Sequence, residues 1–263
     1  MNATILSAVP AVAVRMPAGR VVGAYLAEAR SECLRYLRNP AFMLPILLFP
    51  GMCYLVFGIL MAKANGADAA RYLLASYGVF GVMSPGLFGF GVSLALERDG
   101  GLLTLKRALP MPPGAYLLGK MLMAMAAAAV VVSMLLAMAL GLAHLSLTMA
   151  QAGGLLLVGV LGVLPFCALG MFVGAVIKGQ GAPGMLQLIY LPMSILSGLW
   201  FPLSMMPKTV QQIAPLWPSY HLDRIALAGV GMAQEAWWSH VLVLVVFAVV
   251  FFLLAARRLR RNG

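Results

Sequence analysis

The chain has 263 residues, of which 63% are apolar and only 10% charged, and its mean hydropathy is +0.98. A soluble domain carries about 45–50% apolar and about 25% charged residues, so this composition excludes an ordinary soluble globular enzyme. Each membrane crossing needs ~20 residues for ~30 Å of hydrocarbon, so six crossings use roughly half of the chain. The composition predicts an all-α polytopic membrane protein with no room for a separate soluble catalytic domain.

The amino-terminal part of the chain predicts a tail followed by an amphipathic helix. Residues 1–19 are small and apolar, but Arg15 follows the apolar stretch, so we expect a tail and not a cleaved signal peptide. Residues 20–40 alternate apolar and charged positions with helical spacing and end at Asn39-Pro40. This pattern predicts an interfacial (elbow) helix that lies along the membrane with its charged residues on the face away from the apolar one.

Apolar runs between residues 41 and 256 predict a six-helix transmembrane domain. The six predicted spans are 41–62, 73–96, 117–142, 152–177, 184–203 and 237–256. The segment before the last span is rich in proline and only partly polar, which predicts re-entrant helical pieces on the external side. Residues 257–263 then form a basic cytoplasmic tail.

The net charge of +11 is distributed unequally between the two sides of the predicted domain. With both termini and the loops 97–116 and 178–183 on one side, that side holds 14 of the 18 basic residues and a net charge of +10, against +1 opposite. The positive-inside rule then predicts that both termini are cytoplasmic. Topology explains the surplus, so we expect contact with anionic membrane lipids and no nucleic-acid partner.

The sequence offers little for catalysis or for metal binding. The run 114–121 approaches a phosphate-binding loop, but it ends in Met121 and follows no strand, so Lys120 is better interpreted as an anchor for the third span. The three histidines and three cysteines lack metal-ligand spacing, and no nucleophile elbow is present. We therefore expect no metal, no cofactor and no enzymatic activity in this chain.

Two further patterns involve single pairs of residues. Asp223-Arg224 is expected to form a partly exposed ion pair worth ~0–1 kcal/mol. Gly170 and Gly174 allow a close helix contact, and the sequence leaves open whether this contact is intramolecular or between two copies of the chain.

The polar run after the second predicted span is the most informative stretch of the sequence. Gly100-Gly101 permits a sharp turn, and the residues that follow predict a short amphipathic helix that Pro110 ends. Its apolar face holds Leu102, Leu105 and Leu109, with Lys106 and Arg107 beside it. Such a helix suits docking into a groove on a soluble partner, and an interfacial connector is the alternative.

The run ERDGGLLTLKRALPMPPGAYLLGK over residues 97–120 resembles the signature of type-2 ABC exporter permeases. Those proteins carry a Glu-Arg pair, a Gly-Thr-Leu-like segment and a Leu-Pro turn before a Gly-Lys at the third span. A second similarity is SGLWFP over residues 197–202, which is followed by a proline-rich external segment. The chain departs from the pattern at residues 101–104, where relatives more often read Gly-Thr-Leu-Glu.

The resemblance implies a permease subunit of the bacterial inner membrane. Such a subunit forms a homodimer, or a heterodimer with a second permease, and pairs with two copies of a separate ABC ATPase that binds ATP and Mg²⁺. The residues it assigns to ATPase coupling are Glu97, Arg98, Gly101, Leu102, Leu105, Lys106, Arg107, Leu109 and Pro110. Those it assigns to an external gate are Leu199, Trp200, Phe201 and Pro202.

The resemblance and the composition together predict the function. A transmembrane region without charges suits a hydrophobic or amphiphilic cargo better than a small ion. We therefore expect ATP-driven export of a drug, a lipid, or a lipid-linked glycan or polysaccharide. A membrane anchor or assembly protein that transports nothing is the alternative, and an ion-coupled secondary transporter is less favoured because intramembrane carboxylates are missing.

Overall fold

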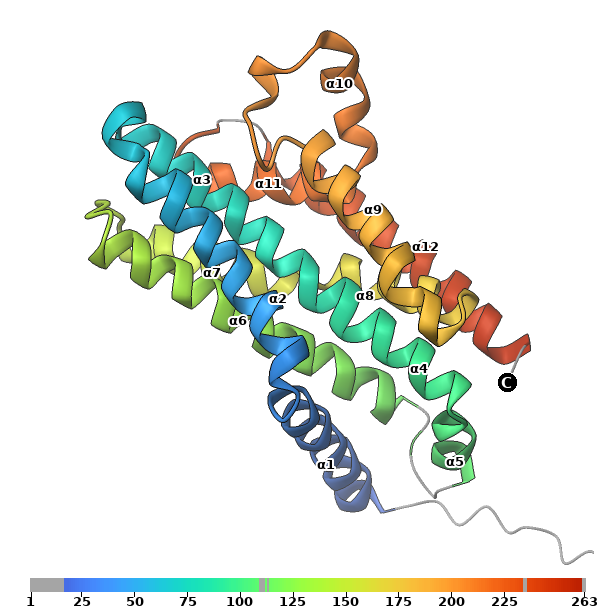
Figure 1. Ribbon diagram of the computed structural model, residues 1–263. Helices are drawn as coiled ribbons and strands as arrows, with labels where there is room; N and C mark the ends of the chain where they lie inside the picture. Colours follow the sequence, from blue (N-terminus) through green and yellow to red (C-terminus); the bar gives the residue numbers. More distant parts are fainter. Residues whose placement is uncertain (1–16, 109–111, 113, 234–235, 262–263) are drawn as a thin grey trace, which may run out of the picture.

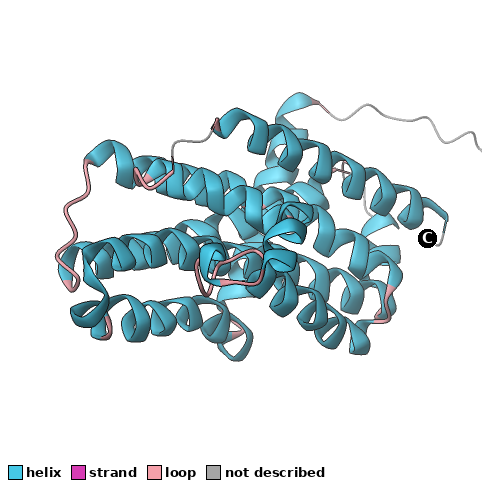
Figure 2. Cartoon of the chain, turned by 90° about the horizontal axis from the view of Figure 1, so that it is seen from above, coloured by secondary structure: helices cyan, strands magenta, loops and turns pink. Residues whose placement is uncertain are grey.

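The computed structural model describes residues 17–108, 112, 114–233 and 236–261. Within these ranges the chain forms helices joined by short turns and contains no strand (Figure 1, Figure 2). The predicted all-α class is confirmed. Helices α1 and α5 and the end of α12 lie at one end of the bundle, and α10 and α11 lie at the other (Figure 1).

The first half of the chain folds into two long, locally irregular helical rods that follow α1. The elements are α1 (Ala18–Leu37), α2 (Pro40–Cys53), η1 (Tyr54–Leu60), α3 (Ala62–Ser84), η2 (Pro85–Val92), α4 (Ser93–Asp99) and α5 (Leu102–Ala108). The first rod consists of α2 and η1, and the second rod consists of α3, η2 and α4. Both η1 and η2 are π-helical; η1 begins four residues after Pro50, and η2 begins at Pro85. Because proline has no backbone N–H, the i→i−4 ladder is interrupted there, and π-helical turns are frequent at functional sites.

The second half begins with regular helices and then breaks into short pieces. The elements are α6 (Ala115–Gly141), α7 (Met149–Gly162), α8 (Leu164–Val176), η3 (Gly179–Gly181), α9 (Ala182–Leu196), η4 (Leu203–Met205), α10 (Lys208–Ile213), η5 (Ala214–Leu216), α11 (Pro218–Gly229) and α12 (Trp237–Arg261). A capping box between Thr148 and Gln151 begins α7. Helix α12 continues through Arg261, so the predicted basic tail starts as part of this helix.

Five helical stretches within the described ranges are long and apolar enough to cross a membrane. They are Met43–Leu60, Asp68–Asp99, Ala115–Gly141, Met149–Val176 and Trp237–Arg260. The predicted span at 184–203 corresponds to α9, whose 15 residues extend only roughly 22 Å at 1.5 Å per residue. That length is less than the ~30 Å of a typical hydrocarbon core, so a crossing by α9 stays a prediction.

Glycines bring η2 and α8 into backbone contact. A Cβ atom placed on Gly170 would lie 2.6 Å from the carbonyl oxygen of Gly86, and one on Gly174 would lie 2.5 Å from that of Gly91. No side chain fits at either position, so the two helices can approach this closely only because these residues are glycine. The Gly170 and Gly174 pair therefore serves an intramolecular contact, which decides between the two alternatives that the sequence left open.

Candidate functional site

A cluster of charged side chains lies where α1, α4, α5 and α6 meet. Its six members, here called the charge network, are Glu28, Glu32, Arg35, Glu97, Lys106 and Lys120. Three are acidic and three are basic, so their formal charges cancel. Buried charges are tolerated when they are paired and hydrogen-bonded in this way.

Lys120 on α6 is the centre of the charge network and is 0% exposed. Its Nζ lies 3.0 Å from Glu32 Oε2, 2.8 Å from Glu97 Oε1 and 2.8 Å from Ser93 Oγ. Glu97 also accepts a hydrogen bond of 2.7 Å from the Tyr116 hydroxyl. All three ammonium donors of Lys120 are therefore used, which is the condition for holding this cation away from water.

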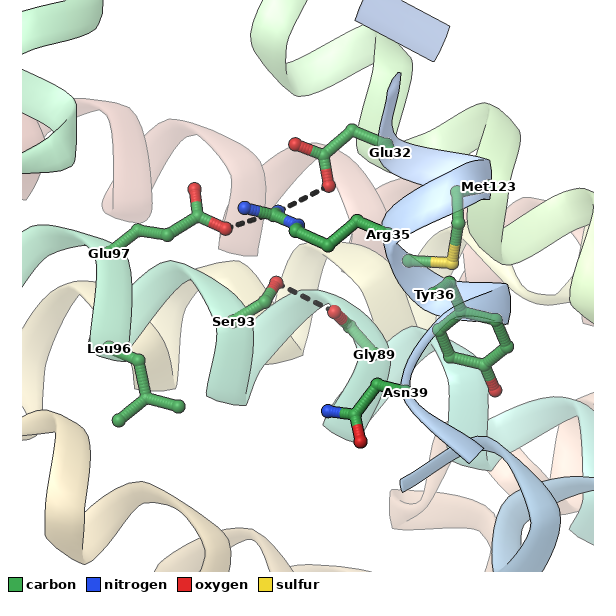
Figure 3. A pocket seen from close by; sticks show the side chains of 9 residues that line it. All are labelled: Glu32, Arg35, Tyr36, Asn39, Gly89, Ser93, Leu96, Glu97 and Met123. Carbon is green, nitrogen blue, oxygen red and sulfur yellow. Dashed lines mark hydrogen bonds and ion pairs between the residues drawn. The ribbon is translucent and has the colours of Figure 1, made fainter. Parts of the chain in front are cut away.

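Arg35 on α1 lies between two carboxylates. Its Nη2 atom is 2.5 Å from Glu32 Oε2 and also pairs with Glu97 on α4 (Figure 3). Burial opposes the charge of this guanidinium, but Glu97 and Glu32 outweigh it and raise the pKa of Arg35. These contacts join α1 to the end of the second rod.

Lys106 connects the short helix α5 to the charge network. Its ammonium pairs with Glu28 and lies 3.5 Å from Glu32 Oε1. The same ammonium is 4.5 Å from the centre of the Tyr116 ring, within the range of a cation–π contact. Through this one side chain α5 is attached to both α1 and α6.

A cavity of about 220 Å³ opens beside the charge network (Figure 3). Arg35, Asn39 and Ser93 are among its polar lining residues, and Gly89 and Met123 also line it. The side chain of Arg35 is 44% exposed, whereas that of Lys120 is not exposed at all. The solvent-accessible edge of the network therefore lies at Arg35, and its centre is dry.

The acidic residues of α1 face protein, which the sequence pattern did not predict. Glu28 and Glu32 are only 8% and 3% exposed, whereas the apolar Val22, Leu26 and Leu37 are 58%, 65% and 60% exposed. Because lipid and not water is the expected surroundings of this helix, its apolar side chains can face outward while Glu28 and Glu32 face protein. Helical spacing of the acidic pair, i and i+4, was the signal that placed both on one face.

The interpretation of Lys120 as an anchor for the third span is wrong, because its side chain is fully buried in the protein. A lysine at the beginning of a predicted span is usually expected to reach the headgroup region. Lys120 instead points into the protein, because Glu32 and Glu97 come from other helices to meet it. The partners lie 88 and 23 residues away in sequence, so local pattern cannot reveal them.

Arg98 lies next to Glu97 but serves a different contact. Its guanidinium donates to the carbonyl oxygens of Gly174 (3.0 Å) and Ile177 (2.8 Å), and the neighbouring Asp99 accepts from the backbone N–H of Gly179 (2.7 Å). The last carbonyl groups of a helix lack intrahelical hydrogen-bond donors, and Arg98 supplies such donors at the end of α8. The structure thus places Arg98 against α8 and away from α5.

The predicted short helix after the second span is present as α5. Gly101 has a φ of +76°, which permits the turn between α4 and α5 without strain. Leu105 is 62% exposed and Leu102 is half-buried, whereas Lys106 faces α1 and not the outer side of the helix. Of the other residues assigned to coupling, the Arg107 side chain and all of Leu109 and Pro110 lie outside the described part of the chain.

The residues assigned to an external gate form a turn after α9. Leu199 is fully buried, Trp200 and Pro202 are half-buried, and Phe201 is 57% exposed. The hydroxyl of Tyr72 donates a 2.6 Å hydrogen bond to the carbonyl oxygen of Gly198, which fixes the turn against α3. The structure therefore packs this turn against α3.

Asp223 on α11 is a buried carboxyl group at the opposite end of the bundle from α5. It is 4% exposed, and its Oδ1 atom has no hydrogen-bond partner among the described residues. Burial raises its pKa to about 7. The neighbouring Arg224 lies over the Tyr220 ring, 5.2 Å from its centre. The expectation of a partly exposed pair is wrong because α11 packs Asp223 against the protein.

Two histidines join α11 to α12. The Nε2 atom of His221 lies 2.9 Å from the carbonyl oxygen of Pro215, which can only accept, so Nε2 carries the proton. Its Nδ1 atom then accepts from Nδ1 of His240 at 2.8 Å. Burial, helped by the nearby His240, lowers the pKa of His221 against the opposing effect of the Pro215 carbonyl. No group suited to hold a metal ion occurs within the described ranges.

A helical bundle with five stretches long and apolar enough to cross a membrane is typical of an all-α multi-pass membrane protein. Residues 24–230 match the model of the ABC-2 type transporter family, and the chain belongs to this family of ABC transporter permeases. It is therefore a multi-pass membrane protein and a transmembrane subunit of an ABC transporter, associated with an ABC ATPase.

Curated relatives agree with this family. The chain is 29% identical over 234 residues to a Bacillus subtilis (strain 168) protein named as a transport permease, YvfS, and the match covers 87% of the chain and 94% of that protein. It is 28% identical over 176 residues to the inner membrane transport permease YhhJ of Escherichia coli (strain K12), with 65% of the chain and 47% of YhhJ covered. The chain thus spans about half of the length of YhhJ.

Proposed function

We propose that this chain is the permease of an exporter that moves a hydrophobic or amphiphilic cargo out of the cytoplasm. ATP and Mg²⁺ bind to the separate ATPase subunit, and two ATPase copies serve two permease subunits. One observation carries the proposal: Lys106 attaches α5, with its exposed Leu105, to the buried charge network. A helix that docks on a soluble partner is thereby linked to the helices that line the membrane domain.

The charge network gives α5 a way to move those helices. Removing one partner of a buried ion pair costs ~3–5 kcal/mol, so the paired groups stay together when one of them is displaced. A push on α5 passes through Lys106 to α1, and through Glu32 to Lys120 on α6. Rigid-body tilting of these helices is the expected response.

A groove between α2 and α9 is the proposed cargo path. It has a volume of about 790 Å³, and its lining contains no charged residue but includes Phe49, Phe88, Gln187 and Tyr190. An uncharged lining of this kind suits an amphiphile better than an ion. Apolar residues in the rim of the groove and on the adjoining surface of α9 are exposed, and we propose that a second permease subunit covers them: Leu48, Met52, Leu188 and Ile195.

The same proposal places the protein in the bacterial inner membrane with both termini in the cytoplasm. The basic residues at the end of α12 lie at the same end of the bundle as α1 and α5 (Figure 1). This grouping supports the orientation that the positive-inside rule predicts. The gate turn and α11 then face outward.

The docking step is tested by a charge placed on α5. Leu105→Asp should abolish co-purification of the permease with its ATPase, because a carboxylate would enter the apolar interface. Thr104→Asp is the matched control, since Thr104 is also exposed on α5 and a carboxylate there leaves Leu105 intact. Unchanged co-purification of the Leu105→Asp variant would refute the assignment of α5 as the docking helix.

The transport step is tested in vesicles that contain the permease with and without the ATPase. We expect cargo-stimulated ATP hydrolysis and outward movement of cargo only when both subunits are present. Transport by the permease alone, or ATP hydrolysis that no amphiphile stimulates, would contradict the proposal.

A further inference from the structure

Aromatic side chains gather along the groove between α2 and α9 and continue to the gate turn. Seven rings form a connected series, here called the aromatic column: Phe49, Phe57, Tyr77, Phe80, Phe88, Tyr190 and Trp200. They come from α2, η1, α3, η2 and α9 and from the turn that follows α9. Sequence pattern alone could not group them, because they are spread over about 150 residues of the chain.

Phe80 is the centre of the aromatic column and is 0% exposed. Its ring centroid lies 4.9 Å from that of Tyr190, 5.3 Å from that of Trp200 and 5.8 Å from that of Phe49. The contact with Trp200 is edge-to-face, at 76°. These are the separations at which aromatic pairs attract each other beyond simple burial of area.

The column extends in two directions from this centre. On one side Tyr190 contacts Phe88 at 5.4 Å. On the other side Trp200 contacts Tyr77 at 6.1 Å, and Tyr77 contacts Phe57 at 6.4 Å. The rings therefore form one connected series from the α2–α9 groove to the gate turn.

Two cavities share the aromatic column as a wall. Phe49, Phe88 and Tyr190 line the α2–α9 groove. A second cavity of about 560 Å³ is lined by Phe57 and Trp200, among others. Phe49 is 45% exposed and Phe57 is 36% exposed, so each cavity presents a ring that is not filled in by core packing.

The buried rings of the column are held in fixed positions by their polar atoms. The hydroxyl of Tyr190 accepts from Ser84 Oγ (2.9 Å) and donates to the carbonyl oxygen of Phe80 (3.1 Å). The indole N–H of Trp200 donates to Ser194 Oγ (3.2 Å). Since the protein satisfies these polar groups, the rings need no polar partner from a ligand and are preorganised to offer their apolar surfaces.

We propose that the cargo carries a planar aromatic ring system, which stacks first on Phe49 and then on Phe57 as it passes along the column. This inference rests on the proposed export function and names its substrate class. A saturated chain would gain equally from any apolar wall, whereas an aromatic ring gains ~0.5–1.5 kcal/mol more at each stacking contact. The lining of the α2–α9 groove contains no charged residue, and the charged residue that lines the second cavity is Asp68, so the ring system is neutral or cationic.

The test compares two cations that differ in their apolar part. Ethidium is planar and aromatic, and dodecyltrimethylammonium has a saturated chain. Vesicles with the permease and its ATPase are titrated with each, and the concentration for half-maximal stimulation of ATP hydrolysis is measured. Phe49→Leu and Phe57→Leu should each raise this concentration for ethidium by about 3–10-fold and leave the value for the saturated cation unchanged.

Phe252→Leu is the matched control, because Phe252 is 38% exposed on α12 and belongs neither to the column nor to either cavity. An equal shift for both cations, no shift at all, or a shift of the same size in the Phe252→Leu protein would overturn the inference. Stimulation by the saturated cation but not by ethidium would overturn it as well and leave the export proposal intact. If neither cation stimulates ATP hydrolysis, the proposed function itself fails.

Discussion

The charge network at one end of the bundle and the polar groups of α11 at the other end bury ionisable side chains in opposite ways. In the network, Glu97 has Arg35, Lys120 and Tyr116 as partners. On α11, Asp223 is equally buried, but its Oδ1 atom has no hydrogen-bond partner within the described residues. A fully paired cluster joins helices firmly, whereas a poorly paired carboxyl makes stability depend on pH.

The two arrangements match different tasks. The network connects α5, which is proposed to receive the push from the ATPase, to the membrane helices. Helix α11 lies beside the gate turn, where Ser219 meets Ser197, and its Asp223, with a pKa raised to about 7, changes protonation near neutral pH. The charge network therefore holds its helices together firmly, whereas the stability of the packing around α11 depends on pH.

The largest effect is expected from removing the centre of the charge network. Lys120→Met leaves Glu32 and Glu97 with an excess of buried negative charge, which should cost about 3–5 kcal/mol of unfolding free energy. Thermal unfolding of the purified protein in detergent measures this loss. The double variant Lys120→Met, Glu97→Gln should recover part of it, and an unchanged melting temperature for the single variant would show that the network is not a stabilising unit.

An intermediate effect of opposite sign is expected at Asp223. Its raised pKa means that the folded state favours the protonated carboxyl, so its contribution to stability is complete below about pH 4 and is lost as the pH rises through about 7. Asp223→Asn should therefore raise the melting temperature at pH 8 by several degrees, at ~2–4 °C per kcal/mol. At pH 4 the variant and the unmodified protein should melt together, and a uniform shift at both pH values would exclude titration of Asp223 as the cause.

The smallest effect is expected from the His221–His240 pair. The lowered pKa of His221 means that the folded state favours its neutral form, so stability is present above about pH 6.5 and decreases as the pH falls below it. His221→Gln should remove part of this decrease, because an amide can still donate to Pro215 without taking up a proton. Melting curves between pH 5 and 7.5 measure the change, and an identical acid dependence in the variant would contradict it.

Sequence pattern was sufficient for the features that depend on local periodicity. Apolar runs predicted the helical class, Gly100-Gly101 and Pro110 predicted a short helix after the second span, and the proline-rich segment predicted short helical pieces. The charge network was missed because its partners come from four helices. A pattern shows which face of α1 carries Glu28 and Glu32, but not whether protein or solvent covers that face.

The same limit applies to the roles of neighbouring residues. Glu97 and Arg98 are adjacent, yet they point to different helices, because successive side chains on a helix differ in direction by about 100°. The sequence analysis treated both as coupling residues. The structure connects Glu97 to the network and Arg98 to the end of α8, so the roles of the two residues can be tested separately.

The glycine contact between η2 and α8 determines where this protein can bend. The carbonyl oxygen of Gly86 now meets only a hydrogen atom of Gly170. If either helix slipped by one residue, a side chain would take the place of that hydrogen and would clash with the oxygen. We therefore expect the two helices to move as one body in a transport cycle. Opening and closing are then expected between this body and helices that contact it through side chains, such as α9.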